Sequence, residues 1–170
     1  IINMQLRKGA SAETTTVVRR LQDRVAALAA IHRTLYQSED IGIINVTQIL
    51  RSIISQIANL GLSENSTVSV ETDLEDVVLY PDQAVPLALL VSEAVTNALK
   101  YTQGDHAQIN IRMRLQGTAS ARVEIANTVT LETPLDQHNN GLGTQLIEAF
   151  AMQLDGSLTR QIENGTYVLA

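Results

Sequence analysis

The chain has 170 residues, of which 45% are hydrophobic and 18% charged, and its formal net charge is −6. This length suffices for one or two domains with an apolar core, and no apolar run reaches the roughly 18 residues of a membrane span. The acidic balance disfavours nucleic-acid binding, and the absence of cysteine excludes disulfides and thiolate zinc sites. The three histidines lack metal-site spacing, so we expect no structural metal.

The first 42 residues have the pattern of a helical hairpin. The chain opens on "IINMQLRKG", with no initiator Met and no signal-peptide layout, so we expect a fragment that begins within a helix. Between residues 16 and 36, apolar side chains and one histidine recur with 3-4-3-4-3 spacing. They are Val18, Leu21, Val25, Leu28, His32 and Leu35. Such a heptad seam favours a dimeric four-helix bundle. His32 on this seam indicates a core histidine, with a phosphorylated or pH-sensing histidine as the alternative.

The remaining chain alternates helices with pairs of strands. We expect helices at 46–60, from Pro81 onward and at 142–154, the first capped by Asn45 or Thr47. Apolar or alternating segments predict strands at 67–72, 76–80, 108–115, 121–127, 157–162 and 166–170. The order α, β, β, α, β, β, α, β, β predicts an α/β sandwich with helices on one face of a mixed sheet.

The segment "VSEAVTNALKY", residues 91–101, is typical of a helix with two distinct sides. At 100° per residue, one broad side is apolar. It consists of Leu87, Leu90, Val91, Ala94, Val95 and Ala98. Glu93, Asn97 and Lys100 follow at i, i+4 and i+7, so they form a narrow polar row opposite.

A glycine pair precedes the helix at 142–154. In "NNGLG", Gly141 and Gly143 let the backbone approach an anion, and a helix N-terminus favours phosphate. A plain turn is the alternative explanation of the pair. The polar segment 128–140 before it is long for a connection, so it is a candidate lid.

Together these motifs resemble the GHKL-type ATPase domain of sensor histidine kinases. "LLVSEAVTNALKYT" is similar to their N box, and the segment from "NNGLG" to the C-terminus is similar to their G box and final strands. "RVAALAAIHRTLYQSEDIGIINVTQILRSII" resembles the second dimerisation helix and linker of the HWE-type and related families. The resemblance implies an α+β fold class. It also implies a helical hairpin in residues 1–42, expected to form a dimeric four-helix bundle, followed by a GHKL (Bergerat-type) α/β sandwich in residues 43–170.

The resemblance also implies a nucleotide site with ATP and Mg²⁺ as cofactors. Asn97 would coordinate Mg²⁺ between the nucleotide phosphates, and Glu93 would act as the base. Lys100, or Tyr101 beside it, would meet phosphate or ribose. Gly141 and Gly143 would hold the end of the lid against the phosphates.

In the family, the γ-phosphoryl group passes to a histidine on the first dimerisation helix and then to an Asp of a response-regulator receiver domain. Because "IINMQLRK" resembles the end of that helix, the resemblance implies an acceptor histidine before Ile1, and His32 would lie on the wrong helix. The implied partners are a receiver domain and a second copy of the chain, in the cytoplasm. Nucleic acid and direct membrane contact are not expected.

One motif departs from the family pattern. Where the family has a D-x-G-x-G box whose Asp binds adenine, this chain has Asn127, with Val129 and Leu131 at the glycine positions. A neutral amide recognises an amine less strongly than a carboxylate does. The retained polar row of Glu93, Asn97 and Lys100 and the glycine pair support the leading hypothesis, an ATP-dependent histidine kinase core, whereas the altered box favours the first of two alternatives. The alternatives are a degenerate phosphotransferase or pseudokinase adaptor that docks a response regulator without ATP, and a serine kinase resembling anti-sigma factors.

Overall fold

The structure, a computed structural model, describes residues 42–61, 68–104, 107–129 and 142–170. Within these ranges the helices are α3 (Val46–Gly61), α4 (Pro81–Tyr101) and α5 (Leu142–Gln153). The strands are β1 (Ile44–Asn45), β2 (Ser69–Leu74), β3 (Val78–Leu79), β4 (Gln108–Gln116), β5 (Ser120–Thr128), β6 (Arg160–Glu163) and β7 (Thr166–Leu169). The predicted order of elements is confirmed, with β1 as an addition.

Several predictions lie outside the described residues. The heptad seam, His32, Gly141, Leu131 and most of the candidate lid belong to this group. The four-helix bundle and the domain boundary at residues 42–43 therefore remain predictions. None of the helices in the described ranges is long and apolar enough to cross a membrane.

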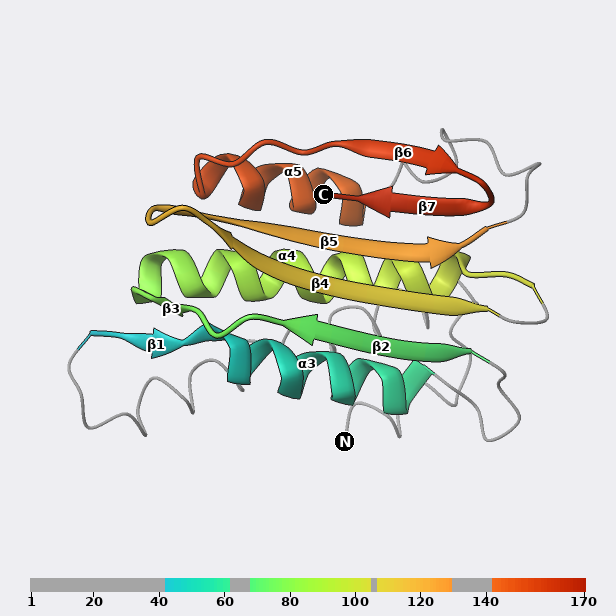
Figure 1. Cartoon of the computed structure of the whole chain (residues 1–170), viewed down its shortest axis with the longest axis horizontal. Coiled ribbons are helices and arrows are strands. Elements are labelled where there is room, and N and C mark those ends of the chain that lie inside the picture. The colour runs from blue at the N-terminus through green and yellow to red at the C-terminus, as the bar shows by residue number, and fades with distance from the viewer. Residues whose placement is uncertain (1–41, 62–67, 105–106, 130–141) are drawn as a thin grey trace, which may run out of the picture.

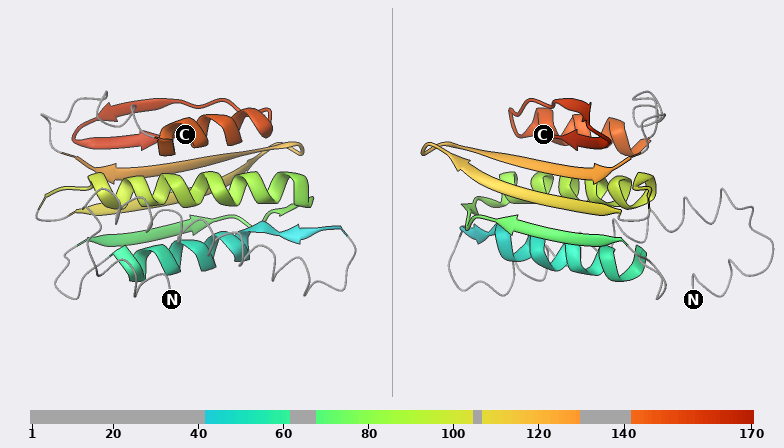
Figure 2. Two further views of the ribbon diagram at one scale, coloured as in Figure 1. Left: turned by 180° about the vertical axis from the view of Figure 1, so that it is seen from behind. Right: turned by 45° about the vertical axis from the view of Figure 1, so that its right-hand side comes forward.

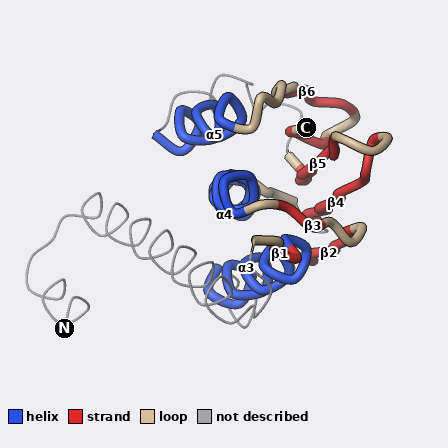
Figure 3. Tube along the Cα trace, turned by 90° about the vertical axis from the view of Figure 1, so that its left-hand side faces the viewer, coloured by secondary structure: helices blue, strands red, loops and turns tan. Residues whose placement is uncertain are grey.

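Five strands form a mixed sheet in the order β2-β4-β5-β7-β6 (Figure 1). β2 is parallel to β4, and the other three pairings are antiparallel. All three helices lie on one face of this sheet (Figure 3). They run side by side with α4 in the centre, in contact with both α3 and α5 (Figure 2). The predicted arrangement, helices on one face of a mixed sheet, is confirmed.

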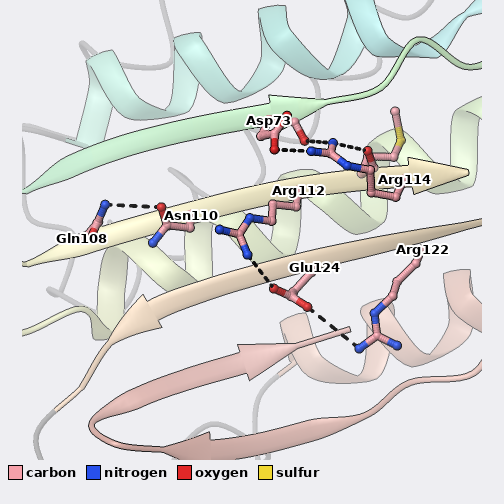
Figure 4. A network of polar contacts seen from close by, with 8 residues as sticks. Asp73, Gln108, Asn110, Arg112, Arg114, Arg122 and Glu124 are labelled. Atoms are coloured by element: carbon pink, nitrogen blue, oxygen red, sulfur yellow. Dashed lines mark hydrogen bonds and ion pairs between the residues drawn. The ribbon is translucent and has the colours of Figure 1, made fainter.

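The two faces of the sheet differ because side chains alternate along a strand. On the inner face of β4, Ile109, Ile111 and Met113 are at most 1% exposed. On the outer face, Glu124 lies between Arg112 and Arg122, with a nitrogen–oxygen distance of 3.9 Å to each (Figure 4). Arg114 pairs with the carboxylate of Asp73 on the same face. The helix-covered inner face is therefore where an enclosed site can form.

The start of α3 ties the smaller strands to the core. Asn45 caps this helix, since its Oδ1 accepts the Gln48 backbone N–H at 3.1 Å. Thr47, the other cap candidate, is buried, and its hydroxyl donates to the Glu75 carbonyl at 2.9 Å. The same hydroxyl accepts the Val77 backbone N–H at 3.0 Å. Of the two predicted caps, only Asn45 has that role.

The strand predicted at 76–80 is present but shorter than predicted. Only Val78 and Leu79 are in strand conformation, and they pair with β1 in a separate two-stranded ladder. Two neighbouring contacts shorten the strand. On one side, Val77 donates to Thr47, and on the other, Tyr80 is the N-cap residue of α4.

Helix α4 is the central element of the core. Pro81 occupies its start, where the missing N–H of proline costs nothing. The apolar side predicted for residues 87–98 is buried along its whole length, with Val91 and Val95 fully covered. The prediction for this side of the helix is therefore confirmed, and α4 fixes the position of its polar row relative to the sheet.

Candidate functional site

The polar row on α4 passes from the protein interior to the surface. Glu93 is 7% exposed, Asn97 is half-buried and Lys100 is exposed. The row therefore does not form a solvent-facing stripe along its whole length. Its inner end is covered by the first turn of α5, where Gly143 lies.

Gly143 lets the two helices approach closely at this point. A Cβ atom at this position would lie 3.0 Å from Glu93 Oε2 and 3.5 Å from both terminal atoms of the Asn97 side chain. The absence of a side chain thus leaves the Glu93 carboxylate and the Asn97 amide beside the N-terminal turn of α5. The partial positive charge of a helix N-terminus favours negatively charged groups there.

A pocket opens beside this contact, on the inner face of the sheet. Its walls come from α4, β5, α5, β6 and β7. The lining residues are Ala94, Asn97, Ala98, Ile125, Asn127, Thr144, Ile147, Arg160, Tyr167 and Leu169. The structure therefore brings together Asn97 and Asn127, which are 30 residues apart in the sequence and were both predicted as ligand-binding residues.

Lys100 and Tyr101 lie apart from the pocket lining, at the C-terminal end of α4. Lys100 Nζ donates to the Tyr101 hydroxyl at 2.9 Å and lies 4.5 Å from the centroid of its ring. A cation held above an aromatic ring is stabilised by the quadrupole of the ring. In this conformation the two side chains bind each other, and any phosphate or ribose contact remains a proposal.

Asn127 provides an available acceptor in the pocket. Its side chain is buried, and its Nδ2 makes only a long hydrogen bond of 3.5 Å to the Thr128 carbonyl. No group in the described ranges donates to its Oδ1. Because an unpaired buried acceptor costs about 1–3 kcal/mol, a ligand that donates a hydrogen bond there would be stabilised.

Val129, at one of the glycine positions of the family's box, does not line the pocket. Its side chain is buried in the hydrophobic core, and it is absent from the pocket lining. Its backbone N–H donates to the Gly165 carbonyl at 2.8 Å, so the β6–β7 hairpin fixes its position. The β-branched residue in place of glycine therefore serves packing of the core in this structure.

Arg160 and Tyr167 are pocket residues that sequence reasoning missed. Arg160 Nη2 lies 2.9 Å from Glu148 Oε1, which links β6 to α5. Burial raises the pKa of the Tyr167 phenol, and the charge of Arg160 and a hydrogen bond with it partly oppose this rise. The alternation in "TYVLA" places Tyr167 and Leu169 on one face of their strand. This pattern does not indicate which strand pairs with theirs.

Comparison with known proteins identifies the relatives of this chain. Residues 1–60 match the family model HisKA_2, described as histidine kinase. This match covers about a third of the chain. No curated protein sequence matches it.

Solved histidine kinases share the fold. The histidine kinase domain of the blue-light activated histidine kinase EL346 from Erythrobacter litoralis superposes with a TM-score of 0.74 at 19% identity, covering 88% of this chain and 71% of that one. A longer structure of the same kinase gives a TM-score of 0.75 at 23% identity, covering 91% of this chain and 54% of that one. ShkA, solved at full length in complex with AMPPNP, gives 0.52 at 12% identity, covering 96% and 40%. The predicted resemblance to sensor histidine kinases is thus confirmed, and the α+β domain described here has their catalytic-domain fold.

Proposed function

We propose that this chain is the dimerisation and catalytic core of a cytoplasmic two-component histidine kinase. In this proposal it uses ATP and Mg²⁺ to phosphorylate a histidine before Ile1, and the phosphoryl group then passes to the Asp of a receiver domain. The contact of Gly143 with Glu93 and Asn97, beside a pocket that contains Asn127, is the observation that supports the proposal most directly.

The donor set fits Mg²⁺ held together with a nucleotide. Mg²⁺ is usually bound by one or two protein oxygens, with substrate phosphates and waters as the other ligands. The Asn97 amide oxygen is a hard ligand of this kind, and the Glu93 carboxylate lies on the same helix face one turn away. The described residues contain no cluster of three or more acidic, histidine or cysteine side chains that could hold the metal alone.

Each residue has a distinct role in this proposal. Bound Mg²⁺-ATP supplies the activated phosphoryl group and the charge that offsets phosphate repulsion. Asn97 would hold the metal, and Glu93, which is buried beside the first turn of α5, would accept the proton of a water or of the attacking imidazole. Asn127 Oδ1 accepts a hydrogen bond from the base. Lys100 and Tyr101 meet phosphate or ribose once their mutual contact opens, and Gly143 keeps the approach to Glu93 clear.

A thermal-shift titration with Mg²⁺-ATP tests the proposal. A ligand at 100 times its Kd stabilises the folded state by about 2.7 kcal/mol. For a domain of this size we therefore expect the Tm to rise by roughly 5–10 °C. Asn97→Ala should abolish the Mg²⁺-dependent part of the shift. Asn59→Ala, which changes an exposed residue of α3, is the matched control and should keep it.

The absence of any shift at millimolar nucleotide would favour the adaptor hypothesis instead. An undiminished shift in Asn97→Ala would show that the polar row is not the metal site. Transfer of the γ-phosphate to histidine is then measured on a longer chain that includes the predicted acceptor, with a receiver domain added in a second step.

A further inference from the structure

The strand register places the pocket residues in two rows on the inner face of the sheet. Asn127 of β5 lies directly opposite Tyr167 of β7, which in turn lies opposite Ile162 of β6. In the next row on the same face, Leu169 lies between Ile125 and Arg160. Because directly opposed residues have their side chains on the same face of a sheet, about 5 Å apart, Tyr167 is the immediate neighbour of Asn127.

Tyr167 takes up much of the space beside this acceptor. The pocket has a cavity volume of about 20 Å³, which is room for about one water molecule. On α4, the pocket wall consists of the small residues Ala94 and Ala98 together with Asn97, so the helix leaves space there. Tyr167 as a whole residue is 9% exposed, and it is the one aromatic residue in the lining of this pocket.

A chain of polar contacts holds the tyrosine in place. The Arg160 guanidinium forms a hydrogen bond with the Tyr167 side chain and an ion pair with Glu148 of α5 at 2.9 Å. Glu148 is exposed at one end of this chain, while Tyr167 is buried at the other. Release of the phenol therefore requires loss of its contact with Arg160, while β7 stays paired with β5 and β6.

We propose that Tyr167 is an internal plug of the base pocket, held by Arg160 and Glu148, and that it must leave its position before a purine can reach Asn127. The inference rests on the proposed nucleotide site and adds a residue that controls access to it. If Tyr167 only packed the core, the polar atom beside it should have a hydrogen-bond partner, because buried polar atoms are normally paired. Asn127 Oδ1 is that acceptor.

Adenosine binding to purified variants tests the plug. Adenosine lacks phosphates, so its affinity reports on the base pocket independently of the Mg²⁺ site. Tyr167→Thr removes the ring and introduces a β-branched residue, which suits a strand. We expect this variant to bind adenosine at least tenfold more tightly than the wild type in calorimetry. Val168→Ala, on the opposite face of the same strand, is the matched control and should bind within twofold of the wild type.

A Tyr167→Thr variant that folds and binds no more tightly than the wild type overturns the plug. Nitration of the wild-type chain by tetranitromethane, read by mass spectrometry, covers the case in which the variant does not fold. We expect saturating adenosine to increase nitration of Tyr167, because the phenol moves out, whereas a core tyrosine would stay equally or better protected. Failure of the proposed function gives a different result. In that case Mg²⁺-ATP does not bind, or it binds the Asn97→Ala variant as well as the wild type.

Discussion

Replacement of Gly143 by alanine is the sharpest test of the contact between α5 and the polar row. The added Cβ would lie 3.0 Å from Glu93 Oε2, which is closer than nine in ten real Cβ contacts, so the carboxylate must shift by a few tenths of an ångström. Overpacking of this kind costs about 1–3 kcal/mol. The higher helix propensity of alanine returns up to about 1 kcal/mol. The free energy of unfolding should therefore fall by about 0–3 kcal/mol.

The effect on ligand binding should be larger than the effect on stability. The methyl group also lies 3.5 Å from the oxygen and the nitrogen of the Asn97 amide, so it occupies the approach to both side chains. We expect the Kd for Mg²⁺-ATP to rise at least tenfold, which corresponds to about 1.4 kcal/mol. Urea denaturation measures the stability, and isothermal titration calorimetry measures the Kd.

Gly156→Ala is the matched control, since its Cβ would lie 3.4 Å from the Ala151 carbonyl, just after the other end of α5. This variant should bind Mg²⁺-ATP as the wild type does. If Gly143→Ala also binds with unchanged affinity, the close approach of α5 to Glu93 and Asn97 has no part in nucleotide binding, and the reasoning from this contact is refuted.

Three further predictions concern stability and assembly. Thr47→Val removes the buried hydroxyl that bonds both Glu75 and Val77, so the free energy of unfolding should fall by about 2 kcal/mol in urea denaturation; a change below about 0.5 kcal/mol would contradict this role. Because burial raises the pKa of Tyr167 above its unfolded value of 10.0, its contribution to stability is complete below pH 10 and declines as pH rises through the folded pKa. Tyr167→Phe should weaken the loss of stability between pH 9 and 11, and an identical pH profile would be the contrary result. The heptad seam predicts a sedimentation mass of twice the 18.5 kDa chain, and a monomer at micromolar concentration would count against the bundle.

The helices and strands that follow from local periodicity could be predicted from the sequence alone. The 3.6-residue repeat of α4 predicted its buried side, because a helix places every third or fourth residue on one face. Alternation along 108–115 and 121–127 likewise predicted β4 and β5, and the glycines after 140 marked the start of α5. Strand β1 and its pairing with β3 escaped prediction, since the two residues of β1 carry no measurable period.

Which faces of these helices and strands pack against one another is seen only in the tertiary structure. The register that sets Tyr167 opposite Asn127 joins strands some 40 residues apart, and a shift by one residue would turn each side chain to the other face. Likewise, "NNGLG" indicated a helix start near an anion site, but its contact with Glu93 arises from the packing of α5 on α4. Such contacts depend on the packing of segments that are distant in the sequence. No local pattern within either segment can specify which residues of the other segment it will contact.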